Sequence, residues 1–249
     1  KFFIESLTEN SRFFPFIRYF IMNDLLTGIQ TAIGLILVAD PEVLNITFRT
    51  LQITFSSVLL STIIAIPLGS AITFRNFHGK KTLISLIQTL YALPTVIVGL
   101  LCYMLLSRSG PLGELRWLFT PNGMIFGQTI LIIPIMTGLS IAALQAIDPV
   151  ITDTIRSLGA SRLQFLRSHL REARFAIMAA IIVGFSRAIS EVGTAIMIGG
   201  NIKGHTRVLT TAISLQTSMG NFNLSLALGI ILLAIALVIN LFMGIVQNR

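Results

Sequence analysis

Long stretches without a single charged residue are the feature that most constrains how this chain folds. A helix of roughly 20 apolar residues crosses the hydrocarbon core of a bilayer, which is about 30 Å thick. Five windows are free of Asp, Glu, Lys and Arg, or nearly so: 51–72, 82–107, 123–147, 175–198 and 222–246. The fourth is interrupted only by Arg187 and Glu191. The sequence therefore predicts five membrane-spanning helices.

The composition also indicates a protein surrounded by lipid. Of 249 residues, 54% are hydrophobic and 11% are charged, and the mean hydropathy is +0.85. A soluble domain of this length could not bury so much apolar surface. We therefore expect an all-α membrane protein, a polytopic helical bundle. The net charge of +8 suits anionic lipid head groups or an anionic cargo, and does not choose between them.

Residues 1–39 are expected to form a separate N-terminal segment, ahead of a transmembrane domain over 40–249. Apolar side chains between Leu25 and Val38 fall near one face of a helix. That helix would be about 21 Å long, too short to cross a bilayer. This favours an amphipathic helix at the membrane interface, with a sixth span as the alternative. The segment lacks the continuous apolar core of a signal peptide.

The basic residues predict the orientation in the membrane. They gather in three places, which are 75–81, 156–174 and the C-terminal Arg249. Each place is two spans from the next, so all three share one side. Short cytoplasmic loops collect Lys and Arg, which predicts a cytoplasmic 148–174 loop and C-terminus in a cell inner membrane. The loops at 108–122 and 199–221 would then lie outside.

Catalytic and metal sites are not expected. Cys102 is the single cysteine and lies in an apolar window, while His78, His169 and His205 are scattered through separate loops. None of them has metal-ligand spacing. The sequence has no glycine-lysine phosphate loop and no clustered nucleophile or carboxylate pair. We therefore expect no catalytic residue, metal, cofactor or nucleic-acid partner, and no ATP hydrolysis by this chain.

The polar segment after the third window has the signals of a helix that ends in a sharp turn. Asp148 provides an N-cap acceptor and Pro149 suits the first helical position. The helix can continue to Leu158, where Gly159 provides a left-handed stop.

A second helix is predicted directly after that turn. Ser161 and Gln164 have the spacing of a capping box. The helix would carry Arg167, Arg171 and Arg174 on one face and lead into the fourth span. These arginines suit lipid phosphates or a protein contact, whereas the rigid helix–glycine–helix element favours transmission of motion from a partner.

This element resembles the EAA loop of the permease subunits of ABC importers. In "DTIRSLGASRLQF" (153–165), residues 153–155 take the three leading positions of that loop and Gly159 its glycine. The family usually has a Leu-Pro pair where this chain has Arg171 and Glu172. This departure affects the expected kink at the entry to the fourth span.

Further segments are similar to molybdate and tungstate permeases, most of all to the tungstate branch. "GFSRAISEVGTAIMIGGN" (184–201) matches the region after the loop. Four shorter matches are "DPEVLNITFRTL" (40–51), "SRSGPLG" (107–113), "LREARF" (170–175) and "RVLTTAI" (207–213). The resemblance covers roughly residues 40–246.

The resemblance implies a type I importer permease with five, or six, spans. Two copies would form the pathway for an oxyanion, a solute-binding protein would deliver it, and a separate ATP-binding cassette ATPase dimer would bind the 153–164 loop. The implied ATPase-coupling residues are Asp153, Arg156, Ser157, Leu158, Gly159, Ala160 and Ser161. Tungstate is the expected cargo, with molybdate, sulfate or phosphate as alternatives. A stand-alone ion-coupled secondary transporter is the alternative from another class.

Candidate pathway residues lie in the fourth window. Charges inside a membrane normally face a bundle interior or a water-filled cavity. Arg187 and Glu191, four residues apart, either form a structural ion pair or act at a gate. In both cases they could hold Ser186 and Ser190 toward the passage. Prolines at 67, 94 and 134 interrupt three windows and are expected to kink them.

Overall fold

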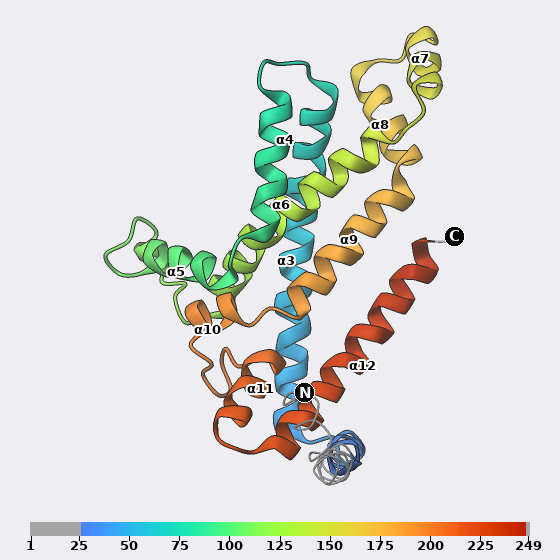
Figure 1. The fold of residues 1–249 in the computed structure, drawn as a ribbon. Helices are drawn as coiled ribbons and strands as arrows, with labels where there is room; N and C mark the ends of the chain where they lie inside the picture. Colours follow the sequence, from blue (N-terminus) through green and yellow to red (C-terminus); the bar gives the residue numbers. More distant parts are fainter. Residues whose placement is uncertain (1–25, 248–249) are drawn as a thin grey trace, which may run out of the picture.

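The computed structural model describes residues 26–247, which form helices joined by turns, with no strand among them (Figure 1). This confirms the predicted all-α fold. The long elements are α3 (Pro41–Phe74), α6 (Pro121–Gln145), α9 (Arg174–Ile189) and α12 (Phe222–Gln247). The shorter elements are α4 (Lys80–Thr89), η2 (Leu90–Ala92), α5 (Thr95–Leu106), η3 (Gly113–Leu115), α7 (Pro149–Ser157), α8 (Arg162–Glu172), α10 (Gly193–Gly199) and α11 (Leu209–Ser218).

Within residues 26–247 the number of candidate spans is between three and five. The helices α3, α6 and α12 are each long and apolar enough to cross a membrane. Two bent pairs bring the number to five if each pair counts as one span. The helix Leu26–Leu37 is apolar but short. It packs on the rest of the protein through Gly28 and the buried Ala32, while its large side chains face outward. The rest of the predicted N-terminal segment lies outside the described residues.

The first span is longer than its charge-free window. Asp40 caps α3, because its Oδ1 accepts hydrogen bonds from the backbone N–H groups of Glu42 and Val43 at 2.9 and 3.0 Å. The helix has 34 residues, or about 51 Å. It therefore also carries Glu42 and Arg49, which the window had placed outside the span.

Helices α3 and α6 pack closely at the centre of the molecule through small and polar side chains. The hydroxyl of Ser57 donates to Gln128 Oε1 at 3.2 Å, and that of Ser61 donates to the Thr129 carbonyl at 3.3 Å. A Cβ added to Gly69 would lie 3.0 Å from the Cβ of Ser140. Lipid provides no hydrophobic force between helices, so close backbone approach and hydrogen bonds stabilise such pairs. Phe185 of α9, fully buried, completes this core.

The second and fourth windows form bent pairs of helices; the bend of the second lies at Pro94, where a kink was expected, and the bend of the fourth corrects the sequence interpretation. The second is bent by 98° between η2 and α5, and the fourth by 57° between α9 and α10. Pro94 lies at the first bend as the N-cap of α5. Pro67 and Pro134, by contrast, lie inside α3 and α6, and each of these helices continues past its proline.

The two bends lie against each other. A Cβ added to Gly193, at the start of α10, would lie 3.2 Å from the side chain of Val96 in α5. One added to Gly99 would lie 3.0 Å from the Cβ of Met197. The half-helices α5 and α10 therefore pack closely as one layer on α6 (Figure 1).

The predicted outer loop 199–221 contains a further helix, α11, with the buried residues Leu209, Thr210, Thr211 and Ala212. It packs on α12. At the opposite end of the molecule lie the 75–79 turn, α7 and α8 (Figure 1). Gln247, the last residue of α12, donates from Nε2 to the Phe175 carbonyl at 3.0 Å, next to the end of α8. The basic segments 75–81 and 156–174 therefore share one end, as predicted, and α12 ends beside them; Arg249 lies outside the described residues.

Candidate functional site

Residues 148–172 form a compact projection, here called the knob, made of α7, a glycine turn and α8. Oδ1 of Asp148 accepts from Val150 N at 2.8 Å and so caps α7. Gly159 has a φ of +71°, the left-handed conformation that favours glycine. Ser161 N donates to Gln164 Oε1 at 2.8 Å and Gln164 N donates to Ser161 Oγ at 3.4 Å, which is the predicted capping box.

His169 attaches the knob to the membrane helices. Its side chain is 1% exposed. The imidazole lies 3.0 Å from Thr152 Oγ1 of α7 and 2.8 Å from the Phe165 carbonyl. Its ring also contacts Phe74 at the end of α3, with 4.9 Å between centroids. The sequence interpretation treated this histidine as one of three scattered ones, because only tertiary structure brings its partners together.

The tip of the knob exposes apolar side chains beside basic ones. Leu158 is 81% exposed, Leu163 74% and Val150 68%. The predicted coupling residues all lie at this tip, and all are exposed except the half-buried Ala160: Asp153, Arg156, Ser157, Leu158, Gly159, Ala160 and Ser161. Asp153 and Arg156 face each other at 4.0 Å, an exposed pair that contributes little stability. Apolar side chains projecting into water in this way are typical of a protein contact.

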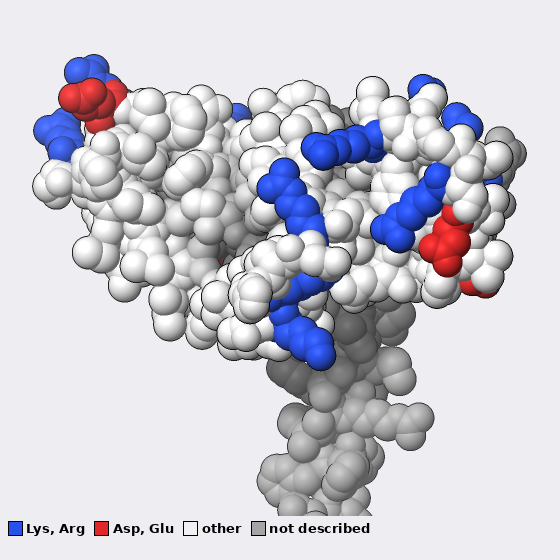
Figure 2. Space-filling model, turned by 90° about the horizontal axis from the view of Figure 1, so that it is seen from above, with Lys and Arg blue, Asp and Glu red and all other residues white. Residues whose placement is uncertain are grey.

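The predicted arginine face is divided between two helices. Arg167 and Arg171 lie in α8, but α8 ends at Glu172 and Arg174 begins α9. The Arg174 guanidinium lies 4.5 Å from the ring centroid of Phe175. The chain breaks its helix at Ala173 without the Leu-Pro pair of the family pattern. All three arginines are exposed at the knob end, where Figure 2 shows Lys and Arg side chains spread over the face.

Arg187 and Glu191 form an ion pair at the bend of the fourth span. Arg187 Nη1 donates to Glu191 Oε2 at 2.8 Å, and the Glu191 side chain is 1% exposed. Since α9 ends at Ile189, Glu191 does not share a helix with Arg187 as the sequence suggested. Its second oxygen accepts from Thr194 N at 2.9 Å, in the first turn of α10. The carboxylate therefore neutralises the arginine and stabilises the start of the next helix.

Ser186 and Ser190 lie on a different side of the same region. Together with Asn240 of α12 they line a cavity of about 280 Å³ between α9 and α12, which Arg187 and Glu191 do not line. Ser186 Oγ donates to Asn240 Oδ1 at 3.3 Å and accepts from its Nδ2 at 3.1 Å. Sequence reasoning missed Asn240, although an amide well inside the fifth apolar window was a signal for it.

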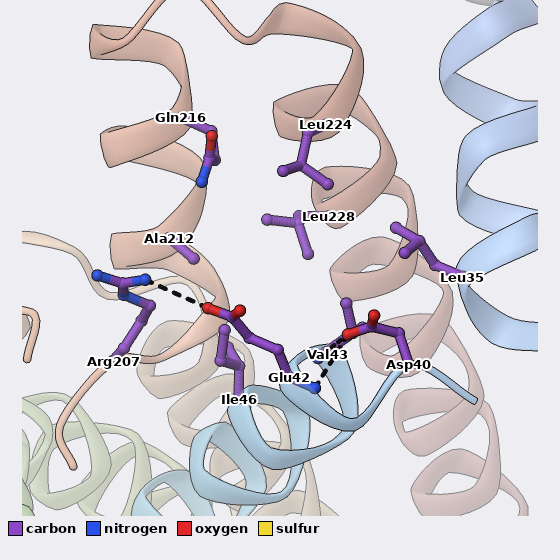
Figure 3. A pocket seen from close by; sticks show the side chains of 10 residues that line it. All are labelled: Leu35, Asp40, Glu42, Val43, Ile46, Arg207, Ala212, Gln216, Leu224 and Leu228. Atoms are coloured by element: carbon purple, nitrogen blue, oxygen red, sulfur yellow. Dashed lines mark hydrogen bonds and ion pairs between the residues drawn. The ribbon is translucent and has the colours of Figure 1, made fainter. Parts of the chain in front are cut away.

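A second cluster that sequence reasoning missed is a group of ion pairs at the opposite end of the molecule. Glu42 binds Lys203 at 2.7 Å and Arg207 at 3.4 Å, and so ties the start of α3 to the turn before α11. Figure 3 shows the Arg207–Glu42 contact beside a small cavity, about 180 Å³ in volume, lined by both residues, by Gln216 and by apolar side chains of α11 and α12. Within the described residues no group of His, Cys, Asp and Glu could hold a metal ion.

Broken membrane helices around a tightly packed pair, with a capped helical knob at one end, define a permease of the type I ABC importer class. The solved structures agree: a chain of a bacterial alginate ABC transporter, crystallised with its alginate pentasaccharide-bound periplasmic protein, superposes with a TM-score of 0.72. The match covers 97% of this chain and 92% of the other. At 21% identity it shows the fold alone.

Sequence comparison places the chain more closely. The model of the family "Binding-protein-dependent transport system inner membrane component" matches residues 57–249, so the chain belongs to that family of membrane permeases. Among curated relatives, the tungstate uptake permease TupB of Peptoclostridium acidaminophilum is 37% identical, over 88% of this chain and 96% of its own length. TupB of Campylobacter jejuni is 35% identical, over 86% and 89%. A probable anion ABC transporter permease of Haloferax volcanii is 40% identical, over 79% and 87%.

Proposed function

We propose that this permease imports tungstate as the membrane half of an ATP-driven transporter, with two copies of the chain forming the pathway. An ATP-binding cassette ATPase dimer binds the knob, and an extracytoplasmic solute-binding protein delivers the anion at the opposite end. The chain itself carries out no catalysis, and ATP hydrolysis belongs to the partner.

The exposed tip of the knob is the feature that supports the proposed ATPase contact. Leu158, 81% exposed, projects directly before the left-handed Gly159, between two helices that are each capped by their own side chains. A fixed element with an exposed apolar tip can transmit a partner's movement, whereas a flexible loop would absorb it. His169 and Phe74 connect this element to α3, which packs on α6 and α9. Movement of the knob would thus reach the helices of the core.

The orientation follows from the same element. The knob and the 75–81 segment carry the basic residues of this end, and α12 ends beside them. By the positive-inside rule, the proposed orientation has that end on the cytoplasmic side of a cell inner membrane. The Glu42–Arg207 cluster then lies on the outer side.

The proposed pathway uses hydroxyl and amide groups in preference to a free cation. Ser186, Ser190 and Asn240 present polar atoms to the cavity between α9 and α12. Arg187 is already neutralised by Glu191, so it would not trap a divalent anion. Conduction requires contacts weak enough for the ion to leave, and neutral groups meet that condition.

The experiment is uptake in proteoliposomes that contain the permease, its ATPase and its binding protein. We expect tungstate to accumulate only when ATP and the ATPase are present on the knob side, and excess tungstate to compete better than molybdate, sulfate or phosphate. Preferential uptake of one of those anions would show that this anion, and not tungstate, is the transported substrate. Uptake without the ATPase would contradict the proposed class of transport.

A further inference from the structure

A groove lies between the end of α3 and the knob. Its volume is about 720 Å³, within the range of about 300–1,000 Å³ that is usual for ligand pockets. Arg75, Arg156 and Arg162 line it. The apolar side chains that line it include Ala71, Phe74 and Phe165. We refer to it as the arginine groove.

The basic side of the arginine groove has no acidic residue among its lining side chains. All three arginines are exposed. Arg156 lies 4.0 Å from Asp153, but both side chains are largely in solvent, so this pair leaves the cation available. An occupant of this side must therefore carry negative charge.

The floor of the groove carries mainly apolar side chains and runs along the charge-free window of α3. Phe74 and Phe165 pack edge to face at 5.1 Å, and the Arg156 guanidinium lies 5.5 Å from the Phe165 ring centroid. The floor continues down α3 to Pro67, seven residues before the helix ends, which is about 10 Å along its axis. A free oxyanion would gain nothing from this floor, and a protein loop would have to enter hydrocarbon to fill it.

We infer that the arginine groove binds an anionic phospholipid, with the phosphate among the three arginines and an acyl chain along Ala71 and Phe74. The guanidinium groups lie at the end of a membrane helix, where long basic side chains meet lipid phosphates. The lipid would fill the space between α3 and the knob and so hold the two together. Lipid binding of this kind does not depend on which anion the permease carries, and the groove shares Arg156 and Ala160 with the proposed ATPase contact.

The test is native mass spectrometry of the full-length permease, purified from membranes of phosphatidylglycerol and phosphatidylcholine, with titration of each lipid. The variant R75Q/R156Q/R162Q removes three charges from the groove. The matched control K81Q/R167Q/R171Q removes three exposed charges from the same end that do not line it. We expect the groove variant to bind phosphatidylglycerol on the order of 100-fold more weakly and the control to stay close to wild type.

A second variant tests the apolar floor while keeping every charge. Ala71 is exposed on α3 and lines the groove, so A71F fills the space without disturbing the packed face of the helix. We expect it to lose retained phosphatidylglycerol as well. Equal losses in the two charge variants would show diffuse attraction to the bilayer and overturn the inference. Unchanged binding in A71F would also overturn it.

Discussion

Nε2 of His169 lies 3.0 Å from Oγ1 of Thr152, so one buried side chain joins the two helices of the knob. The other ring nitrogen, Nδ1, lies 2.8 Å from the Phe165 carbonyl. A carbonyl oxygen can only accept, so Nδ1 carries the hydrogen, and Nε2 forms the hydrogen bond with the Thr152 hydroxyl. The knob therefore depends on an internal hydrogen bond as well as on its caps.

Thr152→Val should loosen the knob without unfolding the membrane domain. It leaves the buried Nε2 without a hydrogen-bond partner, which costs about 1–3 kcal/mol. We expect faster amide hydrogen exchange across residues 149–172 and weaker ATPase stimulation. Thr154→Val is the matched control, because the exposed Thr154 hydroxyl only donates to the Val150 carbonyl of its own helix. Equal exchange in both variants would contradict a joining role for His169.

Substitutions at Gly159 should depend on tolerance of positive φ and not on size alone. A Cβ at this position would meet nothing within 4 Å, so the cost comes from the φ of +71°. Asn tolerates the left-handed region, whereas a β-branched residue does not. Gly159→Asn should therefore retain most ATP-driven uptake and Gly159→Val should lose it, with both proteins present in the membrane. Equal uptake by the two variants would show that the turn geometry is unimportant.

A variant in which the charges of Arg187 and Glu191 are exchanged should be less stable than wild type. The double variant Arg187→Glu/Glu191→Arg retains an ion pair, but arginine cannot accept the hydrogen bond that Glu191 receives from Thr194 N. Arg187→Ala should also be strongly destabilising, by about 3–5 kcal/mol, because it leaves a buried carboxylate without its cation. Thermal unfolding in detergent measures both. An exchanged variant as stable as wild type would reduce the role of Glu191 to pairing alone.

Gly138→Ala should destabilise the contact between α6 and the first bent span. A Cβ there would collide with the hydroxyl of Tyr91, and overpacking of this kind typically costs about 1–3 kcal/mol. Tyr91→Leu in the same chain should recover part of the loss by removing the hydroxyl. Gly229→Ala is the control, since a Cβ there meets nothing within 4 Å. A melting temperature for Gly138→Ala equal to that of Gly229→Ala would contradict the close packing.

The sequence predicted local structure best where short-range chemistry determines it. The Asp148 cap, the Gly159 turn and the Ser161–Gln164 capping box depend on neighbours within four residues, and all three are present. The bend of the second span coincides with Pro94, which the sequence indicated, whereas the fourth window contains no proline and its bend is not revealed by hydropathy.

The missed site residues have the same explanation. His169 meets Phe74 across 95 positions of sequence, and Asn240 meets Ser186 across 54. Arg207 meets Glu42 across 165. Such contacts arise from tertiary packing, so hydropathy and local motifs cannot predict them.

The most direct test of the proposed ATPase contact is site-directed cross-linking at the tip of the knob. Cys102, the single cysteine, is buried, so Leu158→Cys adds one exposed thiol, and Lys203→Cys adds a matched one at the opposite end, where the lysine side chain is 68% exposed. We predict that a short thiol-to-amine cross-linker joins Leu158→Cys to the ATPase subunit and leaves Lys203→Cys unlinked. Full labelling of Leu158→Cys by a water-soluble maleimide in a complex that transports, with no cross-linked ATPase, would contradict the account.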